Sequence, residues 1–257
     1  MAVNAHTSKA APRPPDPASS YFSAVLDAAR RDLGRDLPYG TTVVASVDRE
    51  GSTAAVAYPL GERTVIWCAP AMAPLLSGLN RPDALTNEQF ISAGELLGGT
   101  FGGRGRNLVL TREPASLSDG RYAPAELDRD VASDRELLAA FIGSCSESDL
   151  DEAELDIDEL DAAMLVLVDT AGSIASYASA RPWAMDADFD DIAVITHPYH
   201  RGRRLGAIAV AEFARRRQQA GRMIFYSHGV ENEGSRRVAE TVGFEVLNTV
   251  AAISFSV

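Results

Sequence analysis

The chain has 257 residues, 46% of them hydrophobic and 23% charged, which is typical of a soluble globular protein with one or two domains. Its formal net charge of −12 argues against general nucleic-acid binding, because such binding relies on Lys and Arg to neutralise phosphates. The sequence has no run of ~20 apolar residues and no secretory signal pattern. Its two cysteines, Cys68 and Cys145, imply no disulfide framework. We therefore expect a cytoplasmic protein without membrane attachment.

Composition predicts a disordered leader over residues 1–19. Ala, Pro and small polar residues dominate this segment and offer too little apolar surface to offset the entropy of ordering. A helix is then expected to begin at Tyr21, where apolar residues follow helical spacing, and to end at Gly34.

The remainder of the N-terminal half predicts a smaller mixed α/β domain over residues 20–115. Thr86 and Gln89 form a capping-box pattern for a helix that runs through Leu97. The Gly-rich segment 98–106 has neither a dinucleotide-binding nor a P-loop pattern, and it is interpreted as a flexible turn into a strand. Strands are expected at 41–47 and 53–57, as a hairpin, and at 63–68 and 107–111.

A linker is expected over 116–132, followed by a second domain over 133–257. Ser133 and Glu136 predict the cap of its first helix. The acidic run 147–161 lacks the Gly and Glu positions of an EF-hand loop, so a solvated face is favoured and no metal site is expected. After it the patterns alternate as β-β-β-α-β-α-β. The expected strands are 164–168, 174–180, 191–196, 223–226 and 250–255, and the expected helices are 205–221 and 232–242.

The most informative segment is 190–207, with the sequence DDIAVITHPYHRGRRLGA. An apolar strand runs into a short loop and then into a basic helix start that contains glycine. The first turn of a helix has unpaired N–H groups and the positive end of the dipole, so it favours anions. Arginines add charge-assisted hydrogen bonds. The segment therefore predicts a pyrophosphate-binding site without naming its ligand.

This segment resembles the GNAT (GCN5-related N-acetyltransferase) superfamily. The cofactor motif of that family is [Q/R]-x-x-G-x-[G/A], and the run from Arg201 to Gly206 fits its first and last positions. Arg204 stands where the motif has its first glycine. Downstream, Asn232 and the pair Gly243–Phe244 match the helix N-x-x-A-x-x-L-Y-x-x-x-G-F and its exit, with Ala239 where the family often has a tyrosine.

The resemblance implies an α/β protein with a mixed sheet, whose 133–257 domain has the GNAT fold. It also implies direct transfer of an acetyl group from acetyl-CoA to a primary amine of a small molecule or peptide, with no metal. A homodimer is left open. The residues implied to bind the cofactor are Val194, Ile195, Thr196, Arg201, Gly202, Arg203, Arg204, Leu205, Gly206, Ala207 and Asn232.

Three residues are candidates for proton transfer. The family often places a carboxylate base about eleven residues before the motif, which corresponds here to Asp190, with Asp191 beside it on the opposite strand face. Tyr226, at the end of a strand near the implied thioester, is a candidate to replace the missing tyrosine acid. The changes at Arg204 and Ala239 keep a second hypothesis open, a GNAT-fold binding or regulatory module with weak catalysis. A nucleotide-phosphate enzyme lacks any supporting fingerprint.

Overall fold

The computed structural model describes residues 16–128, 130–153, 155 and 163–256. The first helix, α1 (Pro17–Leu33), begins four residues earlier than expected, within the segment predicted to be disordered. The Asp16 carboxylate accepts the backbone N–H of Ser19 at 3.0 Å, and proline fits the first helical position because its missing N–H would be unpaired there. Residues 1–15 of the predicted leader lie outside the described residues.

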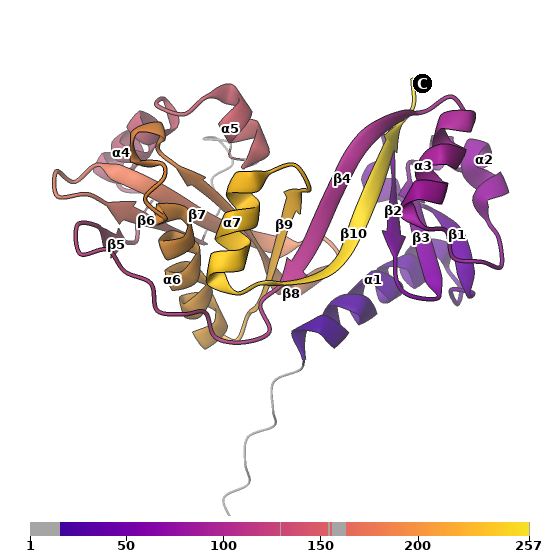
Figure 1. Cartoon of the computed structure of the whole chain (residues 1–257), viewed down its shortest axis with the longest axis horizontal. Helices are drawn as coiled ribbons and strands as arrows, with labels where there is room; N and C mark the ends of the chain where they lie inside the picture. The colour runs from indigo at the N-terminus through magenta and orange to yellow at the C-terminus, as the bar shows by residue number, and fades with distance from the viewer. Residues whose placement is uncertain (1–15, 129, 154, 156–162, 257) are drawn as a thin grey trace, which may run out of the picture.

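The described strands form one mixed sheet in the order β1-β3-β2-β10-β4-β9-β8-β7-β6-β5 (Figure 1), as the expected α/β class requires. Their bounds are β1 (Gly40–Ala45), β2 (Ala54–Pro59), β3 (Arg63–Cys68), β4 (Thr100–Val109), β5 (Ala123–Ala125), β6 (Ala163–Val168), β7 (Ile174–Trp183), β8 (Asp186–Thr196), β9 (Met223–Gly229) and β10 (Glu245–Ser254).

The predicted hairpin between the first two strands is wrong. β1 pairs in parallel with β3, and β2 pairs with β3 in antiparallel fashion, so β3 lies between them. The turn residues after β1 instead form a short 3-10 helix, Val47–Arg49. β-Branched residues indicated each strand, but they do not specify which neighbour a strand pairs with.

Two long strands join the N-terminal and C-terminal parts of the chain. β10 pairs with both β2 and β4, while β4 also pairs with β9 (Figure 1). The Gly-rich segment expected to be a turn is therefore mostly strand, because Gly103 and Gly105 lie opposite Ala252 and Val250 of β10. The two predicted domains share one continuous sheet across this junction, and the domain boundaries themselves stay a prediction.

Helices cover both faces of the sheet. α6 (Leu205–Gln219) packs on one face against Leu165, Ala178 and Ile192, while α1 and α4 (Ala132–Ile142) cover the other face. α4 begins at Ala132 without the predicted side-chain cap. The remaining α-helices are α2 (Ala73–Leu76), α3 (Asn87–Leu96), α5 (Glu147–Glu152) and α7 (Glu233–Val242).

Several local predictions are confirmed and one more is corrected. The Thr86–Gln89 capping box is present at the start of α3, and β6 and β7 form the predicted hairpin. The expected linker contains β5, which forms an edge of the sheet by pairing with β6. Within the described residues, no helix combines the length and apolar character needed to span a bilayer, and no group of three or more His, Cys, Asp or Glu is placed to hold a metal ion.

Candidate functional site

The site lies where two parallel strands separate. β8 and β9 pair over three positions that end at Asp191 and Phe225, although both strands continue beyond that point. The N–H of His197 donates to Ala175 of β7 at 3.0 Å, so odd-numbered residues of β8 direct their backbone groups toward β7. Because a strand has a two-residue period, Ile192 and Val194 direct their backbone N–H and C=O groups toward the opening.

A cavity of about 690 Å³ occupies this opening. This volume lies within the range of small-molecule and cofactor sites. The residues that line it come from α5, β7, β8, the 201–204 segment, α6, β9 and α7. They are Asp149, Glu152, Ala153, Arg181, residues 191–196, Arg201, Gly202, residues 204–207, Tyr226, Ser227, Asn232, Gly234, Ser235, Arg237, Val238 and Thr241.

The beginning of α6 offers backbone donors to this cavity. Its first three N–H groups, from Leu205 to Ala207, have no partner within the helix, and the N-cap residue Arg204 provides no side-chain cap. A Cβ on Gly206 would lie 3.3 Å from both Thr196 Oγ1 and Val238 Cγ2, so glycine keeps this turn close to β8 and α7. The turn therefore presents donors and a positive dipole end to an anion in the cavity.

Arg204 occupies the position where the family motif has glycine. Its φ of 62° makes it the one non-glycine residue with positive φ among the described residues. Only glycine adopts this left-handed conformation without a steric cost. The backbone at this point thus has a conformation that glycine tolerates best, and Arg204 lines the cavity as an additional cationic residue.

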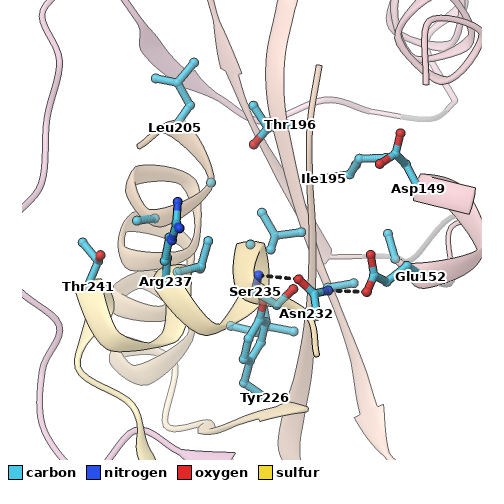
Figure 2. A pocket seen from close by; sticks show the side chains of 18 of the residues that line it. Asp149, Glu152, Ile195, Thr196, Leu205, Tyr226, Asn232, Ser235, Arg237 and Thr241 are labelled. Atoms are coloured by element: carbon cyan, nitrogen blue, oxygen red, sulfur yellow. Dashed lines mark hydrogen bonds between the residues drawn. The ribbon is translucent and has the colours of Figure 1, made fainter. Parts of the chain in front are cut away.

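Three arginines surround the beginning of α6. Arg201 and Arg204 belong to the preceding loop, and Arg237 belongs to α7, where Figure 2 shows its guanidinium pointing toward the start of α6. Arg201 also donates from Nε to the Thr196 carbonyl at 3.3 Å. Arg203 does not line the cavity, because its Nη1 donates to the Tyr122 hydroxyl at 2.8 Å. The structure therefore brings together all the predicted cofactor residues except Arg203.

The acidic helix α5 closes the opposite side of the cavity. Asp149 forms a salt bridge with Arg201 at 2.7 Å, and Glu152 accepts a hydrogen bond from the Asn232 side-chain amide (Figure 2). Asn232 also caps α7 by accepting the backbone N–H of Ser235 at 2.8 Å. Hydrogen bonds from Ser146 and then from Arg201 hold the pKa of Asp149 below its usual value. The described part of the acidic run is thus tied to the site, whereas a solvated face was expected.

The two candidate base residues lie in different surroundings. Asp190 is 2% exposed and forms salt bridges with Arg217 at 2.5 Å and Arg222 at 2.8 Å, on the face of β8 that α6 covers. It does not line the cavity. Asp191 does line it, at the point where β8 and β9 separate. The structure therefore assigns Asp190 a structural ion pair and leaves Asp191 at the site.

Tyr226 lines the cavity from β9, one residue beyond the last β8–β9 pair. Its side chain is 2% exposed and lies below Ser235 of α7 in Figure 2. Burial raises the pKa of Tyr226 to about 12, and a hydrogen bond with Ser235 partly opposes this effect. The phenol therefore keeps its proton at neutral pH.

Sequence reasoning missed several polar residues of the site. Arg237 had a usable signal, because Gly234, Val238 and Thr241 share its face of α7 at helical spacing and follow the predicted Asn232 cap. Ser235 shares this signal, because it lies in the first turn of α7 after the Asn232 cap. Asp149, Glu152 and Arg181 had none, since long-range packing brings them to the cavity.

No protein-family model matches the sequence, and no curated protein sequence matches it. Solved structures of similar fold include a GCN5-related N-acetyltransferase from Sphaerobacter thermophilus, with 16% identity, a TM-score of 0.52, and coverage of 94% of this chain and 93% of that one. A GCN5-related N-acetyltransferase from Kribbella flavida has 16% identity, a TM-score of 0.51, and coverage of 93% and 96%.

A third similar structure is a fungal multi-domain β-N-acetylglucosaminidase with a GCN5-related glucosamine N-acetyltransferase region. It has 11% identity and a TM-score of 0.50, and the match covers 91% of this chain and 37% of that one. At these identities the likeness shows the fold, which is that of the GNAT acetyltransferases. The matches run through both halves of the chain, so the predicted restriction of the resemblance to 133–257 is not confirmed.

Proposed function

We propose that this chain is an N-acetyltransferase that transfers an acetyl group from acetyl-CoA to a primary amine of a small molecule or peptide. One observation carries the proposal: the cavity between the separated strands β8 and β9 leads directly to the uncapped beginning of α6. Backbone donors, a helix dipole and the cations Arg201, Arg204 and Arg237 meet there.

The residues present fit the phosphates and the pantetheine arm of acetyl-CoA. The three open N–H groups of α6 and the neighbouring arginines suit the pyrophosphate and the further phosphate of the nucleotide. The pantetheine arm carries two amides, which suit the backbone groups that Ile192 and Val194 direct into the opening, as in the addition of a strand to a sheet edge. The close approach at Gly206 keeps the helix turn near this edge.

When bound, acetyl-CoA supplies an acetyl group activated as a thioester. Asp191, at the closed end of the opening, accepts a proton from the attacking amine directly or through water. A backbone N–H of β8 stabilises the negative charge that develops on the carbonyl oxygen. Tyr226 donates its phenolic proton to the departing sulfur, so that the new N–C bond replaces the broken C–S bond and a free thiol leaves.

The alternative is a GNAT-fold binding or regulatory module with weak catalysis. Ala239 favours it, because this position lacks the tyrosine that the family often uses as the acid, and the side chain is 1% exposed. Tyr226 and Asp191 favour the enzyme, because both line the cavity near the separation of the strands. The enzyme requires both binding of acetyl-CoA and turnover, whereas the module requires neither, so both quantities are measured.

Turnover is tested by incubating the full chain with acetyl-CoA and a panel of primary amines, including amino sugars, polyamines and peptides, and measuring release of the free thiol. Acetylated product with at least one amine, reduced by D191N, would support the enzyme. The binding module would be favoured if acetyl-CoA binds measurably but the wild type and D191N release the free thiol at the same background rate with every amine.

A further inference from the structure

A buried polar cluster lies behind the 201–204 segment, outside the cavity. Its central residue, His200, is 8% exposed, although it is polar and directly precedes Arg201. The His200 ring lies edge-on to Tyr122, which precedes the edge strand β5, with ring centroids 5.6 Å apart. Because Tyr122 also packs on the α6 core, it links the segment to the body of the protein.

Arg203 and His200 share one hydroxyl group. Arg203 donates to the Tyr122 oxygen at 2.8 Å, and the same oxygen lies 3.1 Å from His200 Nδ1. A guanidinium can only donate, so the hydroxyl accepts from Arg203, and its own hydrogen is available to His200 Nδ1 when that nitrogen carries no proton. In the neutral ring with its proton on Nε2, His200 Nδ1 accepts this hydrogen.

The charged and titratable groups around His200 come from three segments. Asp169, in the β6–β7 turn, places Oδ2 at 3.7 Å from His200 Nε2. Its other oxygen accepts the N–H groups of Ala171 and Ser173 at 2.8 and 3.0 Å, so the carboxylate is fixed. His197 and Tyr199 approach from the loop that leads into the 201–204 segment, Arg203 approaches from that segment, and Tyr122 approaches from the chain before β5. Burial, then Arg203 and His197, lower the pKa of His200 below its usual 6.5.

Protonation would remove this arrangement. With a proton on both ring nitrogens, His200 Nδ1 and Arg203 would both direct hydrogens at the Tyr122 oxygen, and the hydroxyl hydrogen would lose its acceptor. Arg201 and Arg204 lie on either side of Arg203 in the sequence, and both line the cavity. A change in the way Arg203 is held would therefore also change the positions of these two phosphate-binding arginines.

We propose that Tyr122 and His200 are positioning residues that hold the 201–204 segment in its cofactor-binding conformation, and that they do so only while His200 is neutral. The inference rests on the proposed function. It assigns a role to Arg203, the one predicted cofactor residue that the structure places outside the cavity: its guanidinium fixes the segment from behind.

The test is calorimetric titration of acetyl-CoA into the full chain at pH 7.5 and at the lower pH at which an NMR titration of the His200 ring shows it protonated. Y122F removes the shared hydroxyl, and we expect about tenfold weaker binding at pH 7.5, because a hydrogen bond to a charged group is lost. The control is Y199F, which removes a hydroxyl from a ring that is 75% exposed, and it should bind as the wild type does.

H200N tests the pH dependence. The Asn side-chain oxygen can accept from Tyr122 in place of Nδ1 but does not titrate. We expect H200N to bind nearly as the wild type does at pH 7.5, and the wild type to lose several-fold more affinity than H200N on going to the lower pH. The ionisation of the ligand's own phosphates is common to both proteins and cancels in this comparison. Circular dichroism confirms that each variant is folded at both pH values.

The outcomes separate the inference from the proposed function. If the wild type binds acetyl-CoA and Y122F binds equally well, the positioning role is overturned while the proposed function stands. Equal loss of affinity in the wild type and H200N at the pH where His200 is protonated overturns the requirement for a neutral His200. Absence of binding by the wild type at pH 7.5 overturns the proposed function, and the inference with it.

Discussion

The Asp149 carboxylate forms a salt bridge with the Arg201 guanidinium at 2.7 Å, across the cavity that we propose binds acetyl-CoA. A cofactor phosphate at Arg201 would compete with this carboxylate for the same donors. The Arg201 side chain is 48% exposed and that of Asp149 is 26% exposed, so the pair is worth no more than about 1 kcal/mol.

We therefore expect D149N to bind acetyl-CoA about two- to fivefold more tightly than the wild type, as measured by calorimetry. Asparagine retains an oxygen that can accept the hydrogen bonds of the Ser146 cap. The control is D151N, which removes the same charge from an exposed position of α5 that does not line the cavity. Equal effects of the two substitutions would indicate a general charge effect and contradict competition at Arg201.

Arg204 predicts a specific difference between two substitutions. R204A and R204G both remove the guanidinium, but only glycine relieves the left-handed backbone with φ of 62°. We expect the free energy of unfolding of R204G to exceed that of R204A by about 1 kcal/mol, measured by urea denaturation. Equal stabilities would show that the backbone at this position carries no strain.

We expect substitution of Asp191 to lower turnover and substitution of Asp190 to lower stability. D191N should lower kcat by about 10²–10⁴-fold and leave acetyl-CoA binding nearly unchanged, because a general base is lost. D190N should lower the free energy of unfolding by about 2–3 kcal/mol, because it breaks a buried carboxylate's salt bridges with two partly exposed arginines. A loss of turnover in D190N with unchanged stability would return the role of base to Asp190.

Tyr226 is expected to act as the proton donor to sulfur. Y226F should lower kcat about 100-fold with little change in the KM for acetyl-CoA. Since the pKa of Tyr226 is about 12, the wild type should show no decline in kcat from this residue between pH 7 and pH 10. Unchanged kcat in Y226F would exclude the phenol as the acid.

The parts of the site that lie close together in the sequence could be predicted from it. The strand β8, its loop and the start of α6 follow one another in 190–207, and Asn232 begins α7 as the motif indicated. These elements depend on local periodicity and capping, which a single sequence records. The restriction of the fold likeness to the C-terminal half is not confirmed, because β4 and β10 connect the halves through pairing that local patterns do not encode.

Residues contributed by tertiary packing could not be predicted. Asp149 and Glu152 reach the site because α5 lies across the cavity, and nothing in the acidic run distinguishes them from neighbours such as Asp151. Arg203 satisfied the motif in sequence, but Tyr122, 81 residues away, holds its guanidinium outside the cavity. Side-chain direction in a loop depends on such partners, which sequence spacing alone does not reveal.

Titration of the full chain with acetyl-CoA tests the central claim most directly. The comparison is between the wild type, an R201A/R237A double variant that removes two cations of the cavity, and R236A as the control. Arg236 neighbours Arg237 on α7 but forms salt bridges with Glu233 and Glu240 and does not line the cavity. We predict micromolar binding by the wild type and R236A, and binding at least about tenfold weaker in the double variant. Absence of binding by the wild type, or equal affinity in the double variant, would contradict the proposed cofactor site.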